Sequence, residues 1–140
     1  MAELPTHEIQ TFDLNTGEML LEGKEGTKVA RTDITIVEIQ VAATGGETNL
    51  HSHSGSDGTW YIVSGRARFY TTDDELIGEF GAGQGVLIPR GTPYWFECIS
   101  PENTVILHVF TLAKGEENQR TNYNDRSRPD LRPPPVVAQS

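Results

Sequence analysis

The sequence is poor in cysteine and in hydrophobic residues, and each shortage excludes something. Cys98 is the only cysteine, so the chain cannot close an internal disulfide, and we expect a reducing, cytoplasmic location. No apolar run approaches the roughly 18 residues of a membrane-spanning helix, and the N-terminal residues lack the basic and apolar stretches of a signal peptide. Hydrophobic residues make up 36% of the 140 residues, which suffices for one small domain.

Basic residues are also scarce, with 11 Lys and Arg against 20 Asp and Glu, which gives a net charge of -9. This balance excludes nucleic acid and anionic membrane surfaces as partners, because both require clustered positive charge. Residues 115–140 carry four acids and four arginines, so the whole negative charge belongs to residues 1–114. An anionic substrate therefore needs local positive charge, for which the sequence offers Arg90 or a bound cation.

Composition divides the chain into three parts. We predict an N-terminal strand arm over residues 1–29 and a β-barrel over residues 30–112, where glycines and aromatics concentrate. Residues 113–140 are predicted to form a polar tail, which contains four of the eight prolines and has too little apolar content to fold alone.

Strand signals dominate the middle of the chain, whereas helical periodicity is nearly absent. β-branched residues recur with rough alternation in residues 32–42, and Gly-rich turns separate several short runs of the same kind. This pattern predicts an all-β sandwich or jelly roll. The predicted strands cover residues 32–42, 48–53, 59–63, 66–71, 75–80, 85–88, 94–99 and 104–112.

Two segments of this region carry a pattern of histidines and glycines. His51 and His53 point the same way if they lie on one strand, and two such imidazoles can chelate a divalent metal. The pattern resembles the two motifs of the cupin superfamily, which implies a jelly-roll β-barrel, also called a double-stranded β-helix. The matching positions are Gly45, His51, His53 and Gly65 in the first segment and Gly83, Pro89 and Gly91 in the second.

Half of the metal-ligand positions implied by this resemblance are substituted. The family's glutamate falls at Gly58 and its third histidine at Tyr94, so only His51 and His53 remain. A transition metal needs about three protein ligands. Asp57 and His108 are the candidates for the missing ligand, although an Asx turn at Asp57 and a neutral core histidine at His108 are the commoner structural explanations. Weaker candidates are Glu38, Gln40 and Tyr94.

The resemblance leaves three functions open. The first is a small-molecule oxygenase, isomerase or lyase in which His51 and His53 hold Fe, Mn, Ni, Cu or Zn. The second is a metal-free isomerase, epimerase or cyclase, similar to the dTDP-sugar epimerases. In it His51 or His53 removes a carbon-bound proton, and Tyr94 returns one from the opposite wall of the barrel. The third is a ligand-binding barrel without catalysis.

Aromatic residues beside the motifs predict where a substrate lies. Gly58 in place of a glutamate predicts open space next to Trp60, and an aromatic-lined pocket suits a small, even aromatic, ligand. Arg90 is a candidate for binding a substrate carboxylate, and the alternative role for Arg90 is a surface ion pair. The alternative role for the aromatic residues is packing in the hydrophobic core. The resemblance also implies a homodimer. The predicted substrate-binding residues are Trp60, Arg90, Trp95 and Phe96.

Overall fold

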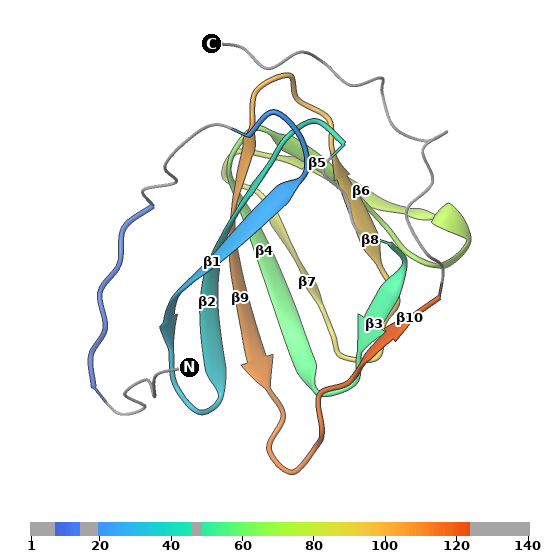
Figure 1. The fold of residues 1–140 in the computed structure, drawn as a ribbon. Helices are drawn as coiled ribbons and strands as arrows, with labels where there is room; N and C mark the ends of the chain where they lie inside the picture. Colours follow the sequence, from blue (N-terminus) through green and yellow to red (C-terminus); the bar gives the residue numbers. More distant parts are fainter. Residues whose placement is uncertain (1–7, 15–19, 46–48, 124–140) are drawn as a thin grey trace.

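The computed structural model describes residues 8–14, 20–45 and 49–123, whose strands form two facing layers. The larger sheet is antiparallel and has the strand order β1-β2-β9-β4-β7. In Figure 1 these strands run side by side across the left and centre of the barrel. They are β1 (Lys24–Arg31), β2 (Thr35–Ala42), β9 (Thr104–Leu112), β4 (Ser56–Ser64) and β7 (Gly85–Ile88).

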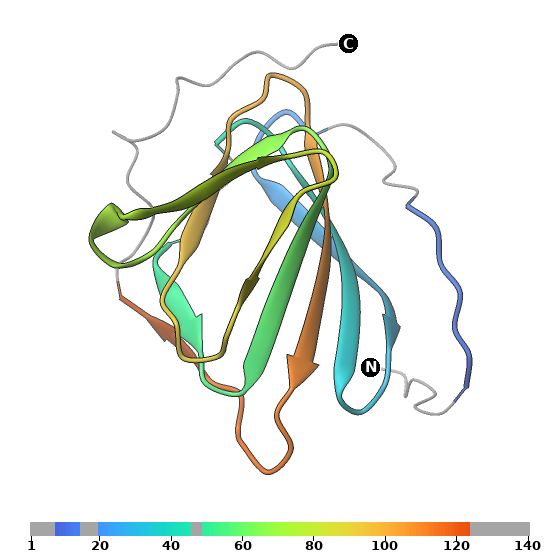
Figure 2. The same cartoon turned by 180° about the vertical axis from the view of Figure 1, so that it is seen from behind.

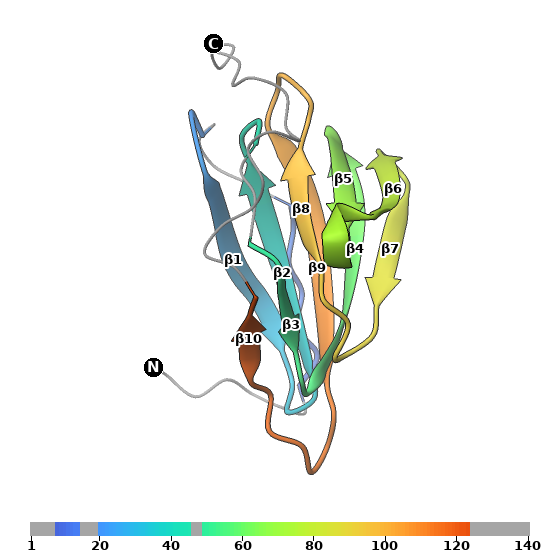
Figure 3. The same ribbon diagram turned by 90° about the vertical axis from the view of Figure 1, so that its right-hand side faces the viewer.

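The second layer combines a three-stranded sheet with a two-stranded one, ordered β6-β5-β8 and β10-β3. An isolated bridge between His51 and Tyr94 joins the two pieces beside β8, and a second one, between Gly45 and Cys98, links β8 to the segment that follows β2. Figures 2 and 3 show this layer from behind and from the side. Its strands are β3 (His51–His53), β5 (Arg66–Tyr70), β6 (Leu76–Gly81), β8 (Trp95–Cys98) and β10 (Arg120–Asn122).

Side-chain alternation along β4 and β8 builds the interior between the layers. Trp60 and Ile62 are buried while Tyr61 between them is 44% exposed, as expected for a strand with one face in the core. Phe69 stacks on Phe96 across the second layer, with ring centroids 4.8 Å apart. The buried apolar cluster consists of Ala42, Trp60, Ile62, Ala67, Phe69, Ile88, Tyr94, Phe96, Cys98 and Ile106.

The predicted all-β jelly roll is confirmed by this arrangement. Among the described residues the helical structure is limited to the short 3-10 turn Thr72–Asp74, and no helix there is long and apolar enough to cross a membrane.

Strands of the barrel extend beyond both predicted domain boundaries. β1 begins at Lys24, within the predicted arm, and β10 lies within the predicted tail. After β9 the chain makes a loop and returns to pair with β3 (Figure 1). We call residues 113–123 the C-terminal strap. The remaining parts of the predicted arm and tail, residues 1–7, 15–19 and 124–140, lie outside the described residues.

Candidate functional site

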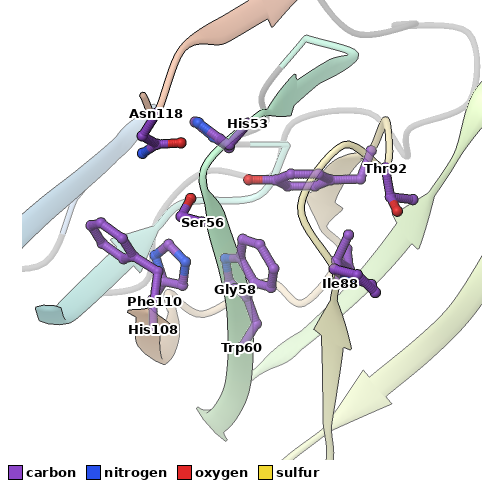
Figure 4. A pocket seen from close by; sticks show the side chains of 11 residues that line it. His53, Ser56, Gly58, Trp60, Ile88, Thr92, His108, Phe110 and Asn118 are labelled. Atoms are coloured by element: carbon purple, nitrogen blue, oxygen red, sulfur yellow. The ribbon is translucent and has the colours of Figure 1, made fainter. Parts of the chain in front are cut away.

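Two adjoining cavities lie between the layers, with volumes of about 80 Å³ and about 400 Å³. Figure 4 shows the smaller one, in which His108 and Phe110 lie on one side and Ile88 and Thr92 on the other. Strands of both layers and the strap contribute to the walls. Both cavities share His53, Trp60, Tyr94, His108 and Phe110.

The two histidines of β3 have different environments. His51 is 2% exposed, and its Nδ1–H donates to the carbonyl oxygen of Asn49 at 2.5 Å, which leaves Nε2 as the ring acceptor. Burial lowers the pKa of His51 to about 4, aided by the charge of Arg120. His53 is half-buried and faces both cavities, and burial also lowers its pKa. Both imidazoles are therefore neutral at neutral pH.

Tyr94 lies directly beside these histidines, and its bridge to His51 corrects the prediction that it stands on the opposite wall of the barrel. Its backbone exchanges two hydrogen bonds with His51, at 3.0 and 2.9 Å, and its ring centroid is 4.4 Å from that of His51 and 6.3 Å from that of His53. Burial raises the pKa of the Tyr94 phenol far above its usual value, so the hydroxyl stays protonated and can donate a hydrogen bond.

His108 lies on the opposite sheet and is held by an acidic partner. Its ring stacks on Trp60 with centroids 4.3 Å apart, and its Nδ1 lies 3.2 Å from Glu38 Oε1. Gln40 Nε2 donates to the same carboxylate oxygen at 2.8 Å. The hydrogen bond from His108 lowers the pKa of Glu38, while burial lowers the pKa of His108. The predicted core histidine is thus also part of the cavity wall.

The Trp60 ring occupies the space immediately over Gly58, while both residues line the smaller cavity, as the predicted open space beside Trp60 requires. A Cβ atom placed on Gly58 would lie 2.6 Å from the Trp60 indole and 3.3 Å from His108 Nε2. Contacts this short do not occur between unstrained groups. The Trp60 ring therefore stands where a longer side chain at position 58 would begin.

The residues predicted to hold a metal, His51 and His53 with Asp57 or His108 as the further ligand, do not form a ligand group among the described residues. Asp57 pairs instead with Arg90, whose backbone N–H and Nη1 both donate to its carboxylate, at 2.8 and 3.2 Å. In residues 8–14, 20–45 and 49–123, no group of three His, Cys, Asp or Glu side chains is arranged to hold a metal ion. Since Gly58 and Tyr94 stand where the resemblance places a glutamate and a third histidine, the residues present do not fit the usual cupin metal.

Two of the four predicted substrate-binding residues line a cavity, namely Trp60 and Phe96. The other two need correction. Trp95 points to the opposite face of β8, where it stacks on Tyr70 and its Nε1–H donates to Asp74. Arg90 lies outside both cavity walls and forms the alternative surface ion pairs, with Asp57 and Glu116 at 3.2 Å each.

Three cations at the larger cavity were not predicted. Lys24 and Lys28 come from β1 and Arg120 comes from β10. All three are exposed and belong to segments that sequence composition places outside the barrel. A three-residue strand such as β10 has no periodic signal, so sequence inspection alone could not place Arg120 beside His53.

Comparisons with known proteins agree on the fold. A family model described as a cupin domain matches residues 37–110, and no curated protein matches the sequence. An uncharacterised conserved protein with a double-stranded β-helix domain from Klebsiella pneumoniae subsp. pneumoniae MGH 78578 has a TM-score of 0.69 at 18% identity, over 84% of this chain and 100% of its own.

Two further solved structures of similar fold belong to named proteins. KdgF from Halomonas sp. has a TM-score of 0.59 at 18% identity, over 66% of this chain and 82% of its own. The vicilin from Solanum melongena has a TM-score of 0.54 at 18% identity, over 66% of this chain and 27% of its own. Its structure is described as revealing different anionic ligands in structurally similar pockets.

Proposed function

Because this chain belongs to the cupin family, we propose that its barrel binds a small organic molecule and moves a proton on it without a metal, as an isomerase, epimerase or cyclase. The observation that carries this proposal is the contact between Tyr94 and the paired histidines in the wall of the larger cavity. A neutral base and a protonated phenol are the two groups that such chemistry requires.

The protonation states assign different tasks to the groups. His53 is neutral and half-buried, so its free ring nitrogen can accept a proton from a substrate carbon and return it to the same or a neighbouring carbon. While His53 holds the proton, the Tyr94 hydroxyl donates a hydrogen bond to the substrate oxygen that carries the negative charge. The enzyme is unchanged after one turnover, and the substrate gains and loses one proton. His51 positions Tyr94 through the two backbone hydrogen bonds.

A metal-dependent oxygenase or lyase has less support, because Trp60 fills the space at Gly58 and Asp57 is paired with Arg90. Ligand binding without catalysis remains the second candidate, and the description of anionic ligands in the vicilin pocket favours it. Cytoplasmic location and assembly as a homodimer are retained as parts of the proposal.

Proton exchange at carbon provides the test. The protein is incubated in D₂O with a panel of small carbonyl and hydroxy compounds, and loss of C–H signals is followed by proton NMR. We expect at least one compound to exchange, and Tyr94→Phe to slow that exchange by about 10²-fold or more. Tyr61→Phe is the matched control, because Tyr61 lies on the outer face of β4 and is 44% exposed.

The outcomes separate the candidates. Exchange at an unchanged rate in Tyr94→Phe would remove Tyr94 from the mechanism. Ligand binding without exchange of any compound would favour the binding protein over the enzyme.

A further inference from the structure

The larger cavity carries an excess of positive charge in a chain whose net charge is -9. Its walls contain the cations Lys24, Lys28 and Arg120 against the single carboxylate of Glu38. Glu38 is already engaged by His108 and Gln40. A cavity lined by one sign of charge attracts ligands of the opposite sign, so the local field favours an anion although the molecule as a whole repels one.

Arg120 is held in place by neutral groups. Its Nε–H donates to Asn122 Oδ1 at 2.9 Å and its Nη2 donates to Asn49 Oδ1 at 2.6 Å. Neither amide neutralises the guanidinium. The backbone of Arg120 is fixed as well, because it is the register partner of His53 in the β10–β3 pair. The guanidinium is thus preoriented for an anionic ligand.

Two buried polar atoms of the same cavity lack hydrogen-bond partners among the described residues. They are the Nε1–H of Trp60, a donor on a side chain that is 2% exposed, and Oε1 of Gln40, an acceptor on a residue that is 6% exposed. Leaving such groups unsatisfied is costly. A ligand that supplies an acceptor oxygen and a hydroxyl donor would satisfy both, whereas an ammonium donor would be repelled by the three cations.

We propose that the larger cavity binds a small hydroxy acid, with its carboxylate at Arg120 and Lys28 and its hydroxyl and remaining oxygen atoms near Gln40 and Trp60. The cavity volume of about 400 Å³ suits such a molecule. This inference rests on the proposed function for the site, since it names the class of substrate on which His53 and Tyr94 act. Arg90 takes no part in this binding, because it lies outside both cavity walls.

Binding to paired probes tests the charge requirement. Trp95→Phe leaves Trp60 as the only tryptophan, whose fluorescence then reports the cavity. A panel of small hydroxy acids that includes lactate, glycerate and mandelate is titrated beside the corresponding neutral amides. We expect at least one acid to bind about tenfold or more tightly than its amide, and Arg120→Gln to remove that preference. Lys28→Gln should weaken acid binding by a smaller factor.

Arg68→Gln is the matched control, because Arg68 pairs with Glu79 on the outer surface, and acid binding should be unchanged. Arg120→Lys keeps the charge and should retain part of the preference, which separates loss of charge from loss of fold. Equal binding of every acid and amide, or a preference that survives Arg120→Gln in a folded protein, would overturn the inference. If acids bind but no carbon-bound hydrogen exchanges, the proposed proton transfer is wrong and the hydroxy-acid site stands. If neutral compounds exchange and acids show no preference in binding, the hydroxy-acid site is wrong and the proposed proton transfer stands.

Discussion

The indole of Trp60 lies nearly parallel to the imidazole of His108, with ring centroids 4.3 Å apart and an angle of 12° between the planes. The two residues are register partners in the β4–β9 pair. Both rings line the smaller and the larger cavity, and the indole occupies the space into which a Cβ at Gly58 would project. The position where the family has a metal-binding glutamate has thus become a place for aromatic packing.

The packing around Gly58 predicts that even a methyl group is harmful there. Gly58→Ala should lower the free energy of unfolding by about 1–3 kcal/mol, because the new Cβ overlaps the Trp60 ring. The same change in a Trp60→Leu background should cost less, since the obstructing ring is absent. Chemical denaturation of the four proteins of this cycle measures the coupling, and an equal cost in both backgrounds would contradict the overlap.

Metal analysis provides a second prediction. After reloading with Fe, Mn, Ni, Cu or Zn and removal of excess metal, the untagged protein should retain less than about a tenth of an equivalent of each. The physical reason is the donor set, in which Asp57 is paired with Arg90 and the Tyr94 phenol stays protonated. His51→Ala is the control. Stoichiometric binding that this variant abolishes would restore the metal-dependent hypothesis.

The buried imidazole of His51 predicts a pH dependence of stability. Its pKa is about 4 in the folded protein and about 6.5 in the unfolded chain. The unfolded state therefore binds a proton between these values while the folded state does not, so stability is complete above pH 6.5 and falls as the pH drops toward 4. The loss due to His51 is at most about 3 kcal/mol.

The contribution of His51 is isolated by comparison with His51→Gln. Unfolding free energies are measured from pH 8 to pH 4 for both proteins, and the difference between the two curves should shrink as the pH falls through this window. A constant difference would mean that the imidazole does not titrate as its burial requires.

The C-terminal strap predicts the effect of truncation. A chain ending at Leu112 should be less stable by at least about 2 kcal/mol than a chain ending at Tyr123, because it loses the pairing with β3 and the hydrogen bond between Tyr123 N–H and the Leu50 carbonyl. The longer chain is the matched control, since it keeps every described contact. Thermal unfolding compares them, and identical transitions would show that the strap adds nothing to stability.

Assembly is tested by light scattering. We expect a mass near twice the 15.4 kDa of the chain at micromolar concentration, and a lower dimer fraction in the chain ending at Leu112. A mass near 15 kDa for the intact protein would contradict the homodimer.

Much of the interior of the barrel follows from the sequence. Alternation along β4 places Trp60 inside and Tyr61 outside, and the spacing of histidines and glycines brings His51, His53 and Tyr94 together. These features are predictable because the side-chain period of a strand is two residues and the glycines mark its turns. Residues close to the motifs are therefore the ones that the sequence located well.

The charges of the site were decided by tertiary structure alone. Arg90, adjacent to a motif, is drawn to Asp57 and Glu116 on the surface, whereas Arg120 reaches the cavity from a segment that looks like a tail. The carboxylate with which an arginine pairs depends on contacts between strands that lie far apart in the sequence. No local sequence pattern encodes these contacts. The sequence by itself determined the all-β barrel and its row of aromatic and imidazole rings. Only the pairing of β1 with β2 and of β10 with β3 decided that this row faces positive charge.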